Sequence, residues 1–208
     1  MTDVTNNAAN NALEFYFDFS SPYGYLAAER IDELAARFGR KVKWRPVLLG
    51  VIFESTGAAP LTTVPLKGDY SKMDFVRSAR FMGIPYNPPT RFPLPTQVAA
   101  RAYYWLHERD CGMARSFAKE VYRALFVDDR DISDPEVVLA IAAALGADRA
   151  ALAVGVETAE IKDRLKAEVA GAIEKGVFGS PLIFCDGEAF FGADRLPQLE
   201  ARLSGKDF

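Results

Sequence analysis

An alternating strand that runs directly into a Ser-Pro dipeptide, over residues 13–26, constrains this chain more than any other feature. The odd positions of the strand are all apolar and share one face: Leu13, Phe15, Phe17 and Phe19. Ser21 stands where the cap of a following helix belongs, and Pro22 takes the first helical position. The pattern predicts a hydroxyl at a helix N-terminus, a place that favours an anion such as a thiolate. A helix cap with no further function would also explain the Ser21-Pro22 dipeptide.

The composition limits both the fold and the partners. The 208 residues are 50% hydrophobic and 12% aromatic, enough to bury one core, with or without an inserted subdomain. A net charge of -3, with no basic-aromatic stripe, argues against a nucleic-acid partner. No apolar run approaches the roughly 18 residues of a membrane span. Residues 1–12 are polar, so we expect a disordered leader and a cytoplasmic protein without a membrane partner.

The thiol and imidazole content excludes several kinds of chemistry. Cys111 and Cys185 are far apart in the sequence and form no metal or redox spacing, which suits a reducing compartment. We expect both to be packing residues. His107 is the only histidine, so the chain has few of the residues from which a zinc site or a Cys-His dyad is built. We therefore predict no metal site.

Hydrophobic periodicity predicts the order of the elements up to residue 176. Helical spacing from Ser21 to a C-cap at Gly39, followed by alternation over residues 41–46, predicts a βαβ unit with a parallel strand pair. Residues 50–69 have little periodicity and predict a long connecting loop. From residue 70 to residue 176 the spacing is helical throughout. The predicted helix caps in this block are Thr96, Ser133 or Asp134, and Thr158.

Strand character returns only near the C-terminus. Residues 181–185 are followed by an Asp186-Gly187 pair, a type I′ hairpin signal, and then by residues 188–191. A final helix is predicted to begin near Asp194. Pro181 opens the first of these strands, where thioredoxin-like folds hold a cis peptide that leaves backbone groups of the preceding residue free to pair with a bound peptide. A trans proline at the start of a strand is the alternative.

The order βαβ, helices, then ββα is that of an α/β protein with a thioredoxin-like fold and an all-helical insertion. We assign residues 13–69 and 177–208 to the thioredoxin-like domain and residues 70–176 to the inserted helical subdomain. This division follows the change of hydrophobic period from 2 to 3.6 and back.

Five segments carry a resemblance to a known family. In chain order they are FYFDFSSPYGYLA, KVKWRPVLLG, PLKGDY, VFGSPLIF and FFGADRL. They resemble segments of the 2-hydroxychromene-2-carboxylate isomerases and of their relatives, the kappa-class glutathione transferases, over residues 13–203. The resemblance implies glutathione as the cofactor and a small aromatic carboxylate as the substrate. We also expect a homodimer.

The resemblance also implies roles for individual residues. Ser21 corresponds to the serine that hydrogen-bonds the glutathione sulfur, which makes it the candidate catalytic residue. The implied glutathione-binding residues are Lys67 for the glycine carboxylate, Ser180 with Pro181 for the cysteinyl part, and Ala193 and Asp194 for the γ-glutamyl part. Arg91 and Phe92 lie in the region that grips the substrate carboxylate in the isomerases. Lys67 and Arg91 have an alternative as solvated surface residues, and Asp194 as the cap of the last helix.

The chain departs from its relatives at several positions. Ala58 stands where the kappa transferases have an asparagine, and Ala193 where they have a serine. Disulfide oxidoreductases of this fold have cysteines at the positions of Ser21 and Gly24, so dithiol exchange by this motif is excluded. A thiol supplied by a cofactor is the natural replacement.

The mechanism implied by the resemblance is covalent catalysis with a nucleophile supplied by the cofactor. The glutathione thiolate adds to a conjugated carbon, the new single bond rotates, and elimination returns glutathione. These steps interconvert 2-hydroxychromene-2-carboxylate and trans-o-hydroxybenzylidenepyruvate. Two alternatives stay open: a glutathione transferase, in which the adduct is the product, and a non-catalytic thioredoxin-like binding module.

Overall fold

The structure is a computed structural model and describes residues 12–206. The strands are β1 (Ala12–Phe17), β2 (Lys41–Pro46), β3 (Leu182–Cys185) and β4 (Glu188–Phe191). The α-helices are α1 (Pro22–Ala28), α2 (Ile31–Arg37), α3 (Leu49–Thr56), α4 (Lys67–Met82), α5 (Gln97–His107), α6 (Cys111–Phe126), α7 (Pro135–Ala144), α8 (Arg149–Gly155), α9 (Ala159–Glu174) and α10 (Leu196–Leu203). Two short 3₁₀ helices are η2 (Leu61–Thr63) and η3 (Ala193–Arg195). The predicted leader, residues 1–12, lies outside the described residues apart from Ala12, which begins β1.

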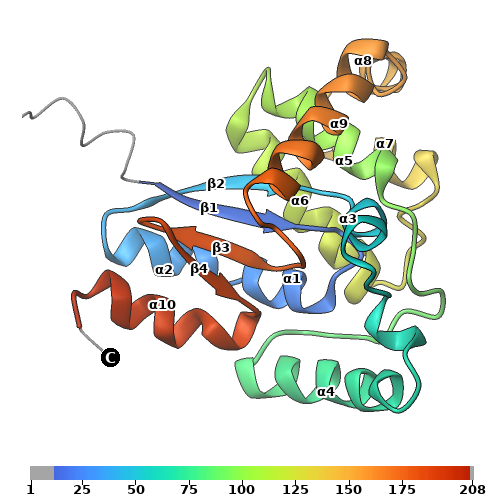
Figure 1. Ribbon diagram of the computed structural model, residues 1–208. Helices are drawn as coiled ribbons and strands as arrows, with labels where there is room; N and C mark the ends of the chain where they lie inside the picture. Colours follow the sequence, from blue (N-terminus) through green and yellow to red (C-terminus); the bar gives the residue numbers. More distant parts are fainter. Residues whose placement is uncertain (1–11, 207–208) are drawn as a thin grey trace, which may run out of the picture.

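The strands form one sheet in the order β2-β1-β3-β4 (Figure 1). β1 runs parallel to β2, with Leu13 opposite Val42. β3 runs antiparallel to β1, with Phe15 opposite Ile183, and β4 antiparallel to β3. The βαβ unit and the C-terminal hairpin therefore share one sheet, and the predicted thioredoxin-like fold with helices inserted between its two parts is confirmed.

The turn between β3 and β4 has the geometry predicted from its sequence. Asp186 has a φ of 52° and Gly187 a φ of 88°, and a type I′ turn requires positive φ at both central residues. The tight turn returns the chain along β3, and η3 then follows β4 and contacts α1. The C-terminal hairpin thus delivers η3 to the start of the first helix.

Aromatic rings from the helical segment pack directly on the sheet. The Phe17 ring lies 6.2 Å from the Tyr103 ring of α5 and 5.7 Å from the Tyr122 ring of α6, centroid to centroid. The apolar face predicted for the odd positions of this strand is fully buried, and Tyr16 and Asp18 on the other face are buried as well. Both faces of the central strand are therefore covered.

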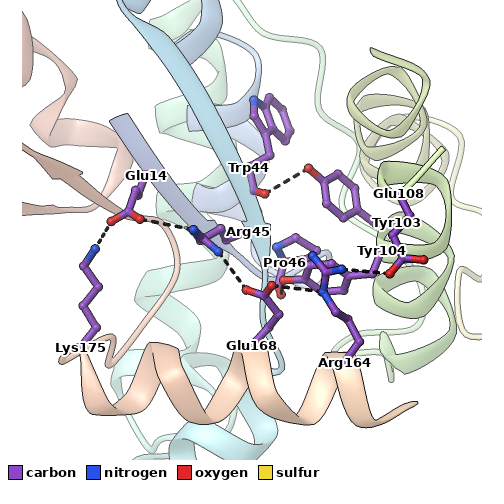
Figure 2. A network of polar contacts seen from close by, with 10 residues as sticks. All are labelled: Glu14, Trp44, Arg45, Pro46, Tyr103, Tyr104, Glu108, Arg164, Glu168 and Lys175. Atoms are coloured by element: carbon purple, nitrogen blue, oxygen red, sulfur yellow. Dashed lines mark hydrogen bonds and ion pairs between the residues drawn. The ribbon is translucent and has the colours of Figure 1, made fainter. Parts of the chain in front are cut away.

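Charged side chains join the second face of the sheet to α9 (Figure 2). Arg45 of β2 lies 3.5 Å from Glu14 of β1 and 2.9 Å from Glu168 of α9. Arg164 continues the chain of charges from Glu168, at 3.3 Å, to Glu108 after α5, at 2.9 Å. These groups are partly exposed, so each pair contributes at most about 1 kcal/mol of stability. The network orients α9 on the sheet.

The helix predicted from Ser21 to Gly39 is interrupted in the structure. α1 ends at Ala28 and α2 begins at Ile31. In the break, the Arg30 guanidinium donates a hydrogen bond to the Met82 carbonyl at 2.6 Å. This partner is distant in sequence, so helical periodicity gives no sign of it.

The prediction of a long loop over residues 50–69 is wrong, since α3, η2 and the start of α4 occupy it. Leu48 at the N-cap of α3 has no side chain that can cap a helix. The Asp18 carboxylate instead accepts a hydrogen bond from the Leu49 amide at 2.7 Å. It satisfies one of the N–H groups that a helix start leaves unpaired. The cap of α3 thus comes from another part of the chain.

The helical block shows further agreements and corrections. α8 was missed although Asp148 caps it, and the prediction that Cys111 is a packing residue is wrong because Cys111 is exposed. Cys185 is buried, as predicted. The division at residues 69 and 177 stays a prediction. Within residues 12–206, no helix is long and apolar enough to cross a membrane, and no cluster of metal-ligating side chains occurs.

Candidate functional site

Ser21 caps α1 and faces the loop that precedes β3. Its Oγ accepts a hydrogen bond from the Gly24 amide at 3.0 Å and donates one to the Ser180 carbonyl at 2.9 Å. The Ser180-Pro181 peptide bond is cis, as predicted. Both serines are nearly buried, with 5% and 9% of their surface exposed. The fold thus brings together two dipeptides that the sequence singled out separately.

The position of the second cysteine of a Cys-X-X-Cys motif is closed. A Cβ on Gly24 would lie 2.6 Å from the Tyr122 hydroxyl and 2.9 Å from Ser180 Oγ, closer than real Cβ atoms approach. The Tyr122 hydroxyl is held in place because it donates to the Asp18 carbonyl at 2.9 Å. Position 24 therefore has room for glycine only, and the second cysteine of a Cys-X-X-Cys motif does not fit there.

Asp18 lies directly behind the Ser-Pro motif, and only 3% of its surface is exposed. Its carboxylate accepts hydrogen bonds from the Ser20 amide at 2.8 Å, the Leu49 amide at 2.7 Å and the Thr96 hydroxyl at 3.0 Å. Burial raises the pKa of Asp18, and these hydrogen bonds only partly offset it. Thr96 does begin α5, as predicted, but its side chain serves Asp18 and does not cap its own helix.

A cavity of about 1650 Å³ opens in front of Ser21. Its walls come from α1, α3, α4, residues 92–97 and η3. The large apolar side chains in these walls include Leu49, Phe53, Phe75, Phe92 and Phe178. Pockets for small molecules usually measure about 300–1,000 Å³. The volume of this cavity therefore exceeds what one small ligand needs.

Most of the residues predicted for the γ-glutamyl and cysteinyl parts of glutathione line this cavity. Ser180, Ala193 and Asp194 line it, and Pro181 is buried beside Ser180. The interpretation of Asp194 as the cap of the last helix is wrong, because α10 begins at Leu196 and Arg195 is its N-cap. The Asp194 side chain is exposed, so it can contact a ligand in the cavity.

The other three predicted residues, Lys67, Arg91 and Phe92, do not all lie at the cavity. Lys67 is the exposed first residue of α4 and does not line the cavity. Phe92 does line it, and its ring lies 6.4 Å from the Phe75 ring. Arg91 points elsewhere: its side chain is 70% exposed and forms an ion pair with Asp131, and neither residue lines the cavity. The structure therefore brings Phe92 to the site and leaves Arg91 outside it.

Sequence reasoning missed a contact that joins α1 to α4 across the cavity wall. The Tyr23 hydroxyl donates to Asp74 Oδ2 at 2.6 Å, and both residues line the cavity. Burial and the Asp74 carboxylate raise the pKa of Tyr23. Tyr23 had a signal in the sequence, since it stands inside the Ser-Pro-Tyr-Gly motif. Asp18 had one too, as a single acid in an otherwise apolar run.

The sheet order, the cis proline opposite the first helix and the Ser-Pro-Tyr-Gly motif define a thioredoxin-fold protein whose motif has no thiol. The model of the family described as "DSBA-like thioredoxin domain" matches residues 12–204. The chain belongs to this family.

Three comparisons show which known proteins this chain is similar to. The chain is 28% identical over 193 residues to 2-hydroxychromene-2-carboxylate isomerase of Pseudomonas putida, covering 92% of this chain and 93% of the relative. It is 27% identical over 210 residues to glutathione S-transferase kappa 1 of Rattus norvegicus, covering 95% and 93%. A solved structure of a 2-hydroxychromene-2-carboxylate isomerase matches with a TM-score of 0.85 at 26% identity, covering 93% of this chain and 95% of that one. The resemblance found in the sequence is confirmed.

Proposed function

We propose that this protein is a glutathione-dependent isomerase that interconverts 2-hydroxychromene-2-carboxylate and trans-o-hydroxybenzylidenepyruvate, or acts on a related aromatic-degradation intermediate. The observation that carries the proposal is the hydroxyl of Ser21 beside the closed position at Gly24. Where a disulfide oxidoreductase has two thiols, this chain has none, so a ligand must supply the sulfur. The similarity to isomerases and kappa transferases supports glutathione as that ligand.

The Ser21 hydroxyl would change its hydrogen-bond acceptor when glutathione binds. In the structure it donates to the Ser180 carbonyl. Rotation about the Cβ–Oγ bond would turn the same proton toward a thiolate sulfur and free the Ser180 carbonyl to accept from the cysteinyl amide. A hydrogen bond to the charged form lowers the pKa of the thiol. Ser21 thus stabilises the nucleophile and does not itself attack.

The ends of glutathione would bind on either side of this point. The Asp194 carboxylate, which lines the cavity, would bind the γ-glutamyl amine, with the Ala193 backbone beside it. Lys67 would reach the glycine carboxylate from the N-terminus of α4, where the nearby Thr62 and Tyr70 already line the cavity. The contact requires the exposed lysine to extend over the cavity rim.

The remaining volume suits an aromatic acid. The rings of Phe75 and Phe92 would hold the substrate ring. Bound glutathione would supply a thiolate for reversible addition to the conjugated carbon, so that the double bond could rotate and glutathione would be neither consumed nor oxidised.

Two other functions use the same fold. A kappa-like transferase would release the adduct as product, and the 27% identity over most of the rat enzyme favours it as second candidate. A binding module would hold glutathione or a peptide without catalysing a reaction.

The homodimer and the cytoplasmic location also stay predictions. Sedimentation would check the first and cell fractionation the second.

Incubation of the protein with glutathione and a panel of hydroxychromene acids separates these functions. Isomerisation with constant total glutathione supports the isomerase. Loss of one glutathione per turnover supports the transferase. Absence of turnover, together with no heat of glutathione binding in calorimetry, would contradict both enzymatic functions.

A further inference from the structure

Asp18 is bonded to several of the segments that meet around Ser21. Its backbone N–H donates to Ser180 Oγ at 3.0 Å, and its carbonyl accepts from the Ser21 amide and the Tyr122 hydroxyl, both at 2.9 Å. Its carboxylate adds the contacts to Ser20, the start of α3 and the start of α5. One buried residue therefore ties together the motif, the cis-proline loop and two walls of the cavity.

The carboxylate of Asp18 has no paired cation to neutralise its charge among the described residues. Among residues 12–206 no cation forms an ion pair with Asp18, and its hydrogen-bond donors are neutral. The titratable group in contact with it is Tyr122 of α6, which stays a neutral phenol because burial raises its pKa. Other charged groups reach the same cavity from its walls: Arg30, Glu33, Arg37, Glu54, Asp74, Arg77, Asp194, Arg195 and Glu200. These are at least partly exposed to solvent, which screens them.

We propose that Asp18 is a positioning residue that fixes Ser21 and Ser180 for glutathione, and that its buried carboxylate competes with the glutathione thiolate for a single negative charge. The proposal rests on the proposed function, because it needs glutathione at Ser21. Ionising both groups would place two like charges beside the nearly buried Asp18 and Ser21, and each would then hold its proton more tightly.

This competition suits a reversible addition. The sulfur must attack the alkene and later leave it, and the nucleophilicity of a thiolate falls as its thiol becomes more acidic. Ser21 alone drives the thiol toward greater acidity. The Asp18 carboxylate opposes Ser21, and the balance keeps the thiol pKa near the ambient pH, where a thiolate is both abundant and reactive.

The test is a titration of thiolate absorbance for glutathione bound to the wild type, to Asp18→Asn and to Asp131→Asn as a carboxylate control outside the cavity. We expect the pKa of the bound thiol to fall by about one pH unit in Asp18→Asn and to stay unchanged in the control. A purely structural role predicts the opposite sign, because a misplaced Ser21 hydroxyl would raise the thiol pKa. An unchanged or raised value would overturn the proposal.

A second variant covers the case in which Asp18→Asn does not fold. Thr96→Val removes one donor to the carboxylate, makes Asp18 harder to ionise and should also lower the thiol pKa. A raised or unchanged thiol pKa in this variant would contradict the competition. If wild-type protein does not bind glutathione in calorimetry, the proposed function itself is wrong, whereas binding without the shift overturns only the role of Asp18.

Discussion

The hydroxyl of Tyr122 stands 2.6 Å from the point that a Cβ on Gly24 would occupy. Because the same hydroxyl is bonded to the Asp18 carbonyl, it cannot move aside without breaking a buried hydrogen bond. The helical segment, through α6, thereby fills the space that a resolving cysteine would need. The loss of dithiol chemistry is built into the packing as well as into the motif.

Gly24→Ala should therefore destabilise the protein by about 1–3 kcal/mol, the usual cost of an overpacked core. Gly171→Ala is the matched control, since a Cβ there meets nothing within 4 Å and the residue lies inside α9. Relieving a helical glycine should stabilise by about 0.5–1 kcal/mol. Urea unfolding of both variants checks the prediction, and equal stability of Gly24→Ala and wild type would mean that the Tyr122 hydroxyl yields easily.

Ser21→Ala should retain much of the glutathione affinity and raise the pKa of the bound thiol. The variant loses the hydrogen bond that favours the thiolate, whereas the proposed contacts of Asp194 and Lys67 remain. Thiolate absorbance against pH measures the shift, and turnover should fall because less thiolate is present at neutral pH. Turnover at the wild-type rate would show that Ser21 does not stabilise the nucleophile.

The sequence was informative where the structural cause is local, as at the Asp186-Gly187 turn and the strand alternation of β1. It failed where the cause is distant. α3 was predicted as a loop because its cap is the Asp18 carboxylate, and the break after α1 coincides with the contact from Arg30 to the Met82 carbonyl. In the site, both dipeptides that contain proline were found, because a fixed φ leaves a signal in the chain itself.

Lys67→Ala should weaken glutathione binding roughly ten- to a hundredfold, the loss expected for one charge-assisted hydrogen bond to a carboxylate. Lys72→Ala is the control, since Lys72 lies on the same helix with its side chain 63% exposed and paired at 3.8 Å with Asp69. Calorimetry measures both affinities. Equal weakening in the two variants would point to the general charge of α4 and would assign Lys67 to solvent.

Tyr23→Phe should loosen α4, because the hydroxyl of Tyr23 donates to Asp74 at 2.6 Å. A hydrogen bond to a charged group contributes about 1.5–3 kcal/mol. Tyr70→Phe removes a more exposed hydroxyl that lies 3.5 Å from the same carboxylate, so its effect should be small. Urea unfolding measures the change in global stability of each variant, and hydrogen exchange of the α4 amides measures the local loosening of α4. Unchanged protection of α4 in Tyr23→Phe would mean that ring packing against Phe75 alone holds the helix.

The buried carboxyl of Asp18 should also affect the pH dependence of stability. Burial raises its folded-state pKa above the ordinary 3.8, so between these two values the folded protein binds a proton that the unfolded chain releases. The contribution of Asp18 to the free energy of unfolding is then fully present below about pH 4 and is lost as the pH rises through the folded-state pKa. Asp18→Asn removes the titration.

The measurement is urea unfolding of the wild type and Asp18→Asn from about pH 3.5 to about pH 7.5, where wild-type stability relative to the variant should decline as the pH rises. Asp131→Asn provides a control of opposite sign. The Ser133 hydroxyl holds the pKa of Asp131 below its usual range, so its contribution is lost as the pH falls. If the stability difference for Asp18 instead grew with pH, its three hydrogen bonds would outweigh burial, and the carboxylate would be a stable anion beside Ser21.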